Sequence, residues 1–293
     1  MRLFKNTNID FVTKSSIAKL FSILLIILSM SSLVYKGGPT LSIDFTGGTI
    51  VQLKFDENVE ISDLRNTLSG QTFENSEIII FGGPDEVLIK TQFSGSNSEL
   101  EANLSSLIKS SFEIRRIESV GPKIGKELQS DALNAILLSL LLILIYISFR
   151  FDRFYAYGSV VALVHDVTIT LGIFSLLNIE IDLTIIAAFL TIVGYSLNDT
   201  IVVFDRIREN VTKHARESLE KIINISLNST LARTIVTSFT TFVVVLSLFL
   251  FGGEVIKNFA FALIVGVFIG TYSSIYVASP VMMYFEKKSI SKK

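Results

Sequence analysis

The chain has 293 residues, of which 49% are hydrophobic and only 18% are charged, with a net charge of −1. A soluble domain carries about a quarter charged residues. The deficit is concentrated here, because residues 133–147 and 236–250 hold no charge at all. This unevenness indicates a membrane protein with several spans and one water-facing domain. The balanced charge points to no nucleic-acid partner. The lack of cysteine excludes disulfides and thiolate metal sites, and two histidines argue against a metal site built on imidazole.

Six apolar segments are long enough to cross the hydrocarbon core of a bilayer, which takes about 20 helical residues. They are predicted at Ile17–Tyr35, Ala132–Phe149, Tyr157–Leu177, Leu183–Phe204, Thr234–Phe251 and Phe259–Phe285. The first is followed by no convincing small-x-small cleavage site, so we interpret it as an uncleaved span. The prediction is a polytopic α-helical membrane protein in a 1+5 arrangement. Its parts are an N-terminus with helix 1 at 1–35, an external domain at 36–131, helices 2–6 at 132–285 and a basic tail at 286–293.

The polar stretch between the first two spans is predicted to fold as an α+β domain. Strand, helix and turn signals follow one another along it. Leu41–Phe45 and Thr49–Phe55 are predicted as extended, Ile61–Leu68 as a helix, Glu77–Phe81 and Val87–Phe93 as strands paired through a turn at 82–85, Ser98–Ser110 as a helix and Phe112–Val120 as the last strand. The order β-α-β-β-α-β is typical of the ferredoxin-like, split βαβ fold.

The orientation follows from the Lys and Arg residues of the short loops. Basic residues gather before the first span, at Arg150 and Arg153, between the fourth and fifth spans, and after the last span. The loop at 178–182 has none, and the loop at 252–258 has only Lys257. Both termini are therefore predicted to face the cytoplasm.

His165 and Asp166 lie near the middle of the third predicted span, where an ionisable side chain is most costly. The pair is compatible with a proton relay and equally with a buried structural pair. Adjacent residues of a helix point about 100° apart, so both cannot face the same partner.

Asp199 lies in the fourth predicted span, near its cytoplasmic end. A polar and small-residue stripe leads up to it at helical spacing, formed by Thr184, Ala188, Thr191 and Tyr195. One interpretation is a carboxylate near the interface that caps or snorkels. The other is a carboxylate that takes up and releases a proton along an aqueous path.

Arg233 opens the fifth predicted span, and Thr237, Thr240 and Thr241 continue its face. The fourth and fifth spans are joined on the cytoplasmic side, so an Asp199–Arg233 contact is expected at the same depth. The alternative is that Arg233 is simply one of the positive-inside charges.

Small residues recur every fourth position in the last span, at Ala262, Gly266, Gly270, Ser274 and Ala278. They predict a close helix–helix contact, with no indication of whether it is internal or between subunits. Enzyme sites are not supported. Ser196 with His165 as its base resembles an intramembrane serine protease only weakly, and no H-E-x-x-H or P-loop motif occurs.

The sequence resembles the SecF family of the bacterial SecDF protein-export complex, in the RND superfamily. The resemblance is carried by several motifs in order: 43–48 (IDFTGG), 120–125 (VGPKIG), 165–167 (HDV), 194–200 (GYSLNDT) with 205–210 (DRIREN), 233–238 (RTIVTS), 251–253 (FGG) and 273–278 (SSIYVA). It implies the RND-type plan of one span, an external domain and five spans.

The same resemblance implies a protein-export accessory subunit in the bacterial inner membrane. It would pair with a SecD-like subunit beside the SecYEG translocon and use the proton motive force to help pull an emerging preprotein outward. It implies that Asp199, Arg233 and Thr237 couple proton flow, with Asp166 and His165 in a supporting role. No cofactor is implied other than the coupling ion, H⁺ or Na⁺. The competing hypothesis is an RND-type half-transporter that exports small or lipidic solutes.

Overall fold

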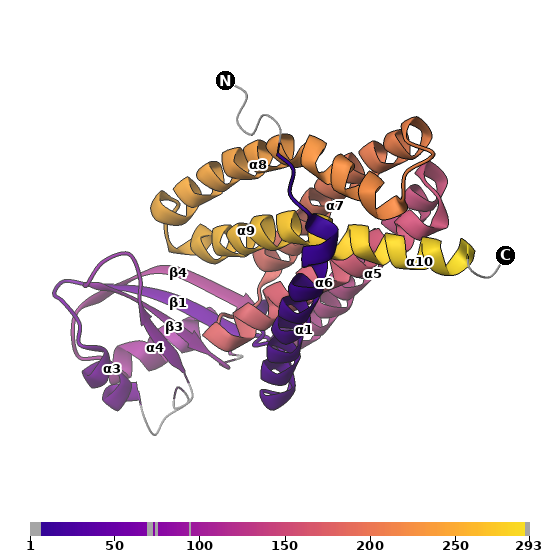
Figure 1. The fold of residues 1–293 in the computed structure, drawn as a ribbon. Helices are drawn as coiled ribbons and strands as arrows, with labels where there is room; N and C mark the ends of the chain where they lie inside the picture. The colour runs from indigo at the N-terminus through magenta and orange to yellow at the C-terminus, as the bar shows by residue number, and fades with distance from the viewer. Residues whose placement is uncertain (1–6, 69–72, 74–75, 94, 291–293) are drawn as a thin grey trace. The chain divides into compact units, whose positions relative to one another are not determined.

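The computed structural model of the chain describes residues 7–68, 73, 76–93 and 95–290 (Figure 1). Two compact units are present, one over residues 41–134 and one that combines 1–40 with 135–293. The first holds a sheet and the second holds the long helices. The basic residues Arg2, Lys5, Lys292 and Lys293, which contributed to the predicted orientation, lie outside the described residues.

The unit at 41–134 is a four-stranded antiparallel sheet with two longer helices. Its elements are α2 (Ile43–Thr46), β1 (Gly48–Phe55), α3 (Ile61–Leu68), β2 (Glu77–Ile80), β3 (Glu86–Thr91), α4 (Asn97–Leu107) and β4 (Phe112–Val120). The strand order is β2-β3-β1-β4. This is the order of the split βαβ pattern, and the ferredoxin-like prediction is confirmed.

The core of this unit forms because alternate side chains of the central strands point to the same face. Val51 and Leu53 of β1 and Ile89 of β3 are fully buried there, against Leu100 and Leu104 of α4. The helix α4 begins at a capping box in which Ser96 and Glu99 satisfy each other's backbone N–H groups.

The predicted strand at Leu41–Phe45 is wrong, because Ile43–Thr46 forms a single helical turn, α2. The Ser42 side chain accepts a hydrogen bond from the Asp44 backbone N–H at 3.2 Å and so starts the turn. Gly47 and Gly48 end it with φ values of 78° and 136°, a backbone that favours glycine. A Cβ on Gly48 would lie 2.7 Å from the Thr91 carbonyl oxygen, so β1 starts at a position that only glycine fits.

Within the described residues, six helices are long and apolar enough to cross a membrane, as predicted. They are α1 (Phe11–Tyr35), α5 (Pro122–Arg150), α6 (Arg153–Leu177), α7 (Leu183–Lys213), α8 (Leu219–Phe251) and a last span made of α9 (Glu254–Ser273), the π-helix η1 (Ser274–Ala278) and α10 (Ser279–Ile290). Several are longer than predicted, because the apolar run marks only the part of a helix inside hydrocarbon. The α8 helix, for example, begins 15 residues before Thr234.

The predicted small-residue seam of the last span makes internal contacts, with α7 at Gly266 and Gly270 and with Gly158 of α6 at Ala278. A Cβ on Gly266 would lie 2.2 Å from Ile192, and one on Gly270 would lie 3.0 Å from the Cβ of Ser196. Ala262, Ser274 and Ala278 are fully buried. The prediction of close packing is therefore confirmed, and the partners are helices of the same chain.

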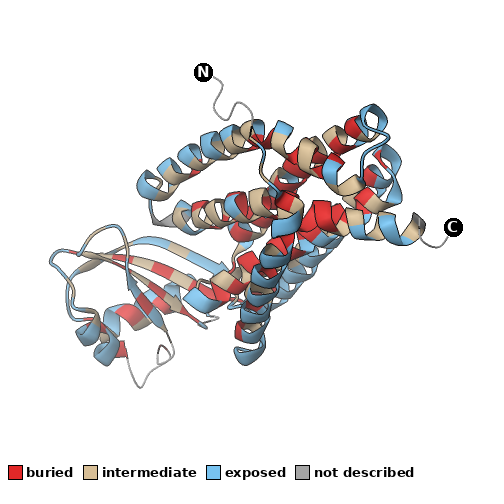
Figure 2. Cartoon of the chain, viewed as in Figure 1, coloured by how far each residue is buried: buried red, intermediate tan, exposed pale blue. Residues whose placement is uncertain are grey.

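The α1 helix packs through serines and exposes its large apolar side chains. Most of its ribbon has the colour of exposed residues in Figure 2. Apart from Phe11, its buried residues are Ser15, Ser22, Ser29 and Ser32. Lipid is as apolar as leucine, so burying Leu or Ile between membrane helices gains little, whereas small residues allow close approach. Gly172 of α6 receives Ser29 so closely that a Cβ there would lie 2.1 Å from the Ser29 side chain.

This contact predicts that an added methyl group lowers the stability of the protein at Gly172 but not at Gly194. Gly172→Ala should lower the free energy of unfolding by about 1–3 kcal/mol, because α1 and α6 must move apart. The matched change Gly194→Ala adds a methyl group on α7 where no atom lies within 4 Å. It should be neutral or slightly stabilising, since alanine favours helix over glycine. Thermal unfolding of the detergent-solubilised chain measures both, and equal midpoints would contradict the packing.

Candidate functional site

Asp199 of α7 is buried within the helix bundle, with 4% of its surface exposed. Its Oδ2 atom has no hydrogen-bond partner among the described residues. The polar groups that act on its carboxylate are the Ser238 hydroxyl and the positive charge of Arg233, both on α8. A carboxylate with an unsatisfied oxygen is costly in a low-dielectric setting. Asp199 therefore lacks the partners that a purely structural buried carboxylate requires.

Arg233 lies beside Asp199 but makes no direct ion pair with it. No carboxylate in the described part of the chain lies within 4.0 Å of its guanidinium. The expected direct contact is therefore absent from this structure, and the charge of Arg233 acts on the Asp199 carboxylate from a distance greater than that of a salt bridge. Arg233 is exposed in the single chain.

Ser238 is a site residue that the sequence argument passed over. Its hydroxyl lies 2.6 Å from the Thr271 hydroxyl of α9 and also faces Asp199. Thr237, the predicted residue, instead donates to the backbone carbonyls of Arg233 and Thr234, both at 3.0 Å. The signal that was available is a second polar face of α8 at helical spacing, through Thr234, Ser238 and Thr241.

The predicted stripe on α7 is not one buried face. Asp199 and Ala188 are buried, while Thr184 and Thr191 are exposed and use their hydroxyls locally. The Tyr195 hydroxyl is buried without a partner among the described residues. The stripe therefore follows the boundary between the packed and the open side of α7.

A polar cavity of about 570 Å³ opens next to Arg233, between α7, α8 and the end of α5. It is lined by Asn198, Asp205, Arg206, Arg208, Arg150 and Arg233 among others. Across it, Arg150 and Arg208 both bind Asp205, at 3.0 and 2.9 Å. The cavity lies on the Arg233 side of the site, which is the side predicted to face the cytoplasm.

Asp166 of α6 is the centre of a second polar group, here called the Asp166 cluster, which consists of His165, Asp166, Ser196 and Ser273. Asp166 is fully buried. Its Oδ2 atom accepts hydrogen bonds from the hydroxyls of Ser196 on α7 at 2.6 Å and Ser273 on α9 at 2.7 Å. Its Oδ1 atom lies 2.8 Å from Nδ1 of His165. In contrast to Asp199, both of its oxygens have partners.

His165 extends the cluster to the first span. Its Nε2 atom lies 3.2 Å from the Ser22 hydroxyl, which in turn lies 2.8 Å from the hydroxyl of Tyr272. Tyr272 donates to the Ala18 carbonyl oxygen at 2.6 Å. The two neighbouring side chains thus bond to each other and then diverge, Asp166 toward α7 and α9 and His165 toward α1.

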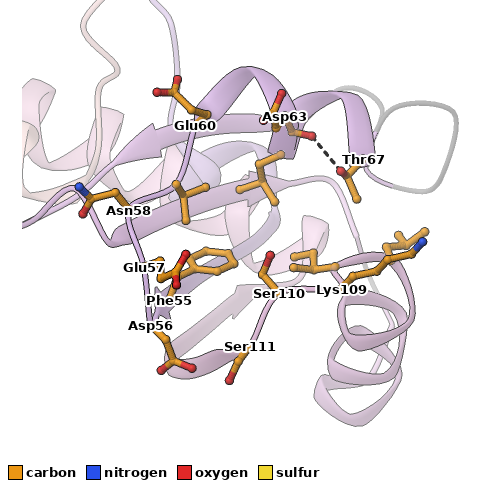
Figure 3. Close-up of a pocket in the computed structure, with 14 residues that line it drawn as sticks. Phe55, Asp56, Glu57, Asn58, Glu60, Asp63, Thr67, Lys109, Ser110 and Ser111 are labelled. Atoms are coloured by element: carbon orange, nitrogen blue, oxygen red, sulfur yellow. Dashed lines mark hydrogen bonds between the residues drawn. The ribbon is translucent and has the colours of Figure 1, made fainter.

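The unit at 41–134 has a surface pocket of about 780 Å³ at one end of the sheet (Figure 3). Its carboxylates do not converge, since Glu60 and Asp56 lie on opposite sides of it in the figure. Across all described residues, no group of three His, Asp or Glu side chains is placed to hold a metal ion. The chemistry is therefore concentrated at Asp199 and Asp166.

The fold and the site together define a class. The chain is a multi-pass membrane protein with an α/β domain after its first span and buried ionisable groups within its helix bundle. Residues 99–288 match the family described as "Protein export membrane protein SecD/SecF, C-terminal", and residues 36–59 match the SecD/SecF GG motif. The chain belongs to the SecD/SecF family.

Individual relatives place it on the SecF side of this family. The protein translocase subunit SecF of Calditerrivibrio nitroreducens is 45% identical, with 95% of each chain covered. The subunit of the same name from Rhodothermus marinus is 44% identical, with 100% of this chain and 98% of the relative covered. The family consists of non-enzymatic subunits. Because this chain is a member of it, protein export is favoured over the export of small or lipidic solutes.

A solved structure shares the whole architecture. The crystal structure of SecDF from Thermus thermophilus, described as a translocon-associated membrane protein, has a TM-score of 0.86 and 40% identity, covering 96% of this chain. This chain spans only 39% of that longer SecDF chain.

The contrast between the two buried aspartates predicts different reactivity toward dicyclohexylcarbodiimide, which enters membranes and modifies protonated carboxyl groups. Asp199 has a free oxygen and should be labelled. Asp166 should resist, because hydroxyl and imidazole groups occupy both of its oxygens. Peptide mass spectrometry locates the label, and Asp199→Asn provides the control. Label on Asp166 with none on Asp199 would contradict the assignment of the two roles.

Proposed function

We propose that the chain couples the movement of a proton, or alternatively a sodium ion, through the membrane to protein export. Asp199 carries the ion, Arg233 is its counter-charge, and Thr237 lies one turn further on the same helix. The observation that carries the proposal is the buried Asp199 carboxylate, which within the described part of the chain has one oxygen without a partner and is influenced by an Arg233 guanidinium that makes no ion pair there. Intramembrane ionisable residues of this kind mark ion paths in transporters.

The physical basis is the cost of a charge in a low-dielectric bundle. When Asp199 is ionised, approach of the exposed Arg233 compensates its charge. When a proton or Na⁺ binds, that attraction is lost and Arg233 returns to the water of the polar cavity. The Thr237 hydroxyl donates to the backbone carbonyls of Arg233 and Thr234 in this conformation, so its proposed part in ion transfer requires a change of rotamer. Binding or release of each ion therefore changes the attraction between α7 and α8. The resulting change in free energy can drive a conformational change in the rest of the protein.

The partners proposed are a SecD-like subunit, the SecYEG translocon and the translocating preprotein. The support is the family and the likeness to a SecDF chain in which this chain matches 39% of the length. The apolar faces of α5 and α8 also support a helical partner and membrane lipid, because Leu137, Leu141, Phe239 and Val244 are exposed in the single chain.

The proposed location is the bacterial inner membrane, with both termini in the cytoplasm. The support is the distribution of basic residues, which gather at the ends of α5 and α7 and are almost absent from the opposite loops.

A gradient experiment tests the coupling. Export into inverted membrane vesicles is measured under an imposed H⁺ gradient and then a Na⁺ gradient. Asp199→Asn should abolish the gradient-dependent part of export without preventing assembly with the SecD-like partner. Glu217→Gln, an exposed carboxylate between α7 and α8 that does not line the cavity, is the control and should retain it, because an exposed ion pair contributes only about 0–1 kcal/mol. Undiminished export by Asp199→Asn would refute the proposal, and the effective gradient identifies the ion.

Orientation is tested with introduced thiols, because the chain has no cysteine of its own. A membrane-impermeant maleimide applied to the outside of the inner membrane should label Lys109→Cys in the α/β domain. It should not label His214→Cys, which lies in the exposed loop between α7 and α8. Labelling of His214→Cys from outside would reverse the proposed topology.

A further inference from the structure

We propose that Asp166 is a positioning residue for the ion-coupling site. Its carboxylate fixes the position of the turn of α7 that carries Asp199. The inference rests on the proposed function, and it adds Ser196 and Ser273 as the side chains through which Asp166 acts.

One oxygen atom of Asp166 joins three helices. Oδ2 of Asp166 accepts from Ser196 and from Ser273, so α6, α7 and α9 meet at a single point. All three residues are fully buried, with 0% of their surface exposed to solvent. Removing either donor would leave a buried acceptor with one bond fewer, which is costly, so the two bonds hold the three helices together at this depth.

The hydrogen bond between Asp166 and Ser196 is linked to Asp199 along α7. Ser196 precedes Asp199 by three residues, so the two lie on neighbouring turns of the same side of the helix. Gly270 of α9 packs directly against Ser196, so the Ser196 backbone cannot move toward α9. A shift of Ser196 therefore moves the Asp199 carboxylate relative to Arg233 on α8.

A second connection to Asp199 runs through α9. Ser273 lies two residues after Thr271, whose hydroxyl lies 2.6 Å from that of Ser238. Ser238 in turn faces Asp199. Asp166 thus reaches the coupling carboxylate from two directions, through Ser196 on its own helix and through Ser273 and Thr271 to the hydroxyl opposite.

The form of the last span agrees with such a role. The π-helix η1 begins at Ser274, immediately after Ser273, and the Ser279 hydroxyl bonds the Ser274 carbonyl oxygen five residues back. Single π-turns inside α-helices occur often at functional sites. Here the change of pitch starts where α9 is fixed to Asp166.

The test removes one donor at a time with Ser196→Ala and Ser273→Ala. Both keep a residue that favours helix, so the chain is expected to fold. The matched control is Ser159→Ala on α6, a buried serine whose hydroxyl has no partner among the described residues. Export by the assembled complex is measured as a function of the size of the imposed gradient, together with the thermal midpoint.

The two donor variants should export roughly tenfold more slowly at a limiting gradient, which is the scale of losing a hydrogen bond to a charged group. Their rate at a saturating gradient should stay near that of wild type, and Ser159→Ala should match wild type throughout. In the Asp199→Asn background, Ser196→Ala should add no further loss. A merely structural role would lower export by the same factor at every gradient, in step with the thermal midpoint, and would overturn the proposal.

Failures of the two proposals are distinguishable. If Asp199→Asn abolishes gradient-dependent export while both donor variants behave like Ser159→Ala, only the positioning role of Asp166 is refuted. If Asp199→Asn leaves gradient-dependent export intact, the coupling function is refuted and the positioning role falls with it.

Discussion

The structure of the membrane unit depends on one constraint, which is that apolar burial does not hold helices together in a solvent that is itself apolar. Contacts must come from close packing of small residues and from hydrogen bonds between side chains. The α7–α9 contact follows this rule through Gly266 and Gly270, and the contacts of α1 follow it through serines. The Asp166 carboxylate is the strongest case, since it joins three helices through hydroxyl donors.

The two buried aspartates differ in how their oxygens are occupied. Both oxygens of Asp166 have hydrogen-bond partners, and these bonds join α6 to α7 and α9. Oδ2 of Asp199 has no partner among the described residues, and the proposed exchange of an ion requires an oxygen that is left free in this way. Under the two proposals, Asp166 fixes the position of α7, and Asp199 on the same helix carries the ion.

Much of this organisation can be predicted from the sequence, because its signals are long or costly. Apolar runs reveal the six spans, and period-2 and period-3.6 patterns reveal the order of the α/β domain. The depth of Asp199 in an apolar run marks it as exceptional. Short-range effects cannot be predicted in this way. The helical turn at Ile43–Thr46, for example, depends on one serine cap and two glycines with positive φ. Ser196, Ser238 and Ser273 cannot be predicted in this way either, because serines are frequent in membrane helices and only the fold shows which of them face a carboxylate.

The serine face of α1 bears on how the protein is made. A helix satisfies all of its own backbone hydrogen bonds, so α1 can enter the bilayer alone, with Leu20, Ile23 and Ile27 already facing lipid as they do in the finished fold. Its packing partner α6 is synthesised only after the whole α/β domain. During that interval the small buried face of α1 exposes little that would attract a wrong neighbour. Assembly is then completed late in synthesis, when α6 has been made. Gly172 can then pack against Ser29, and His165 can form its hydrogen bond with Ser22.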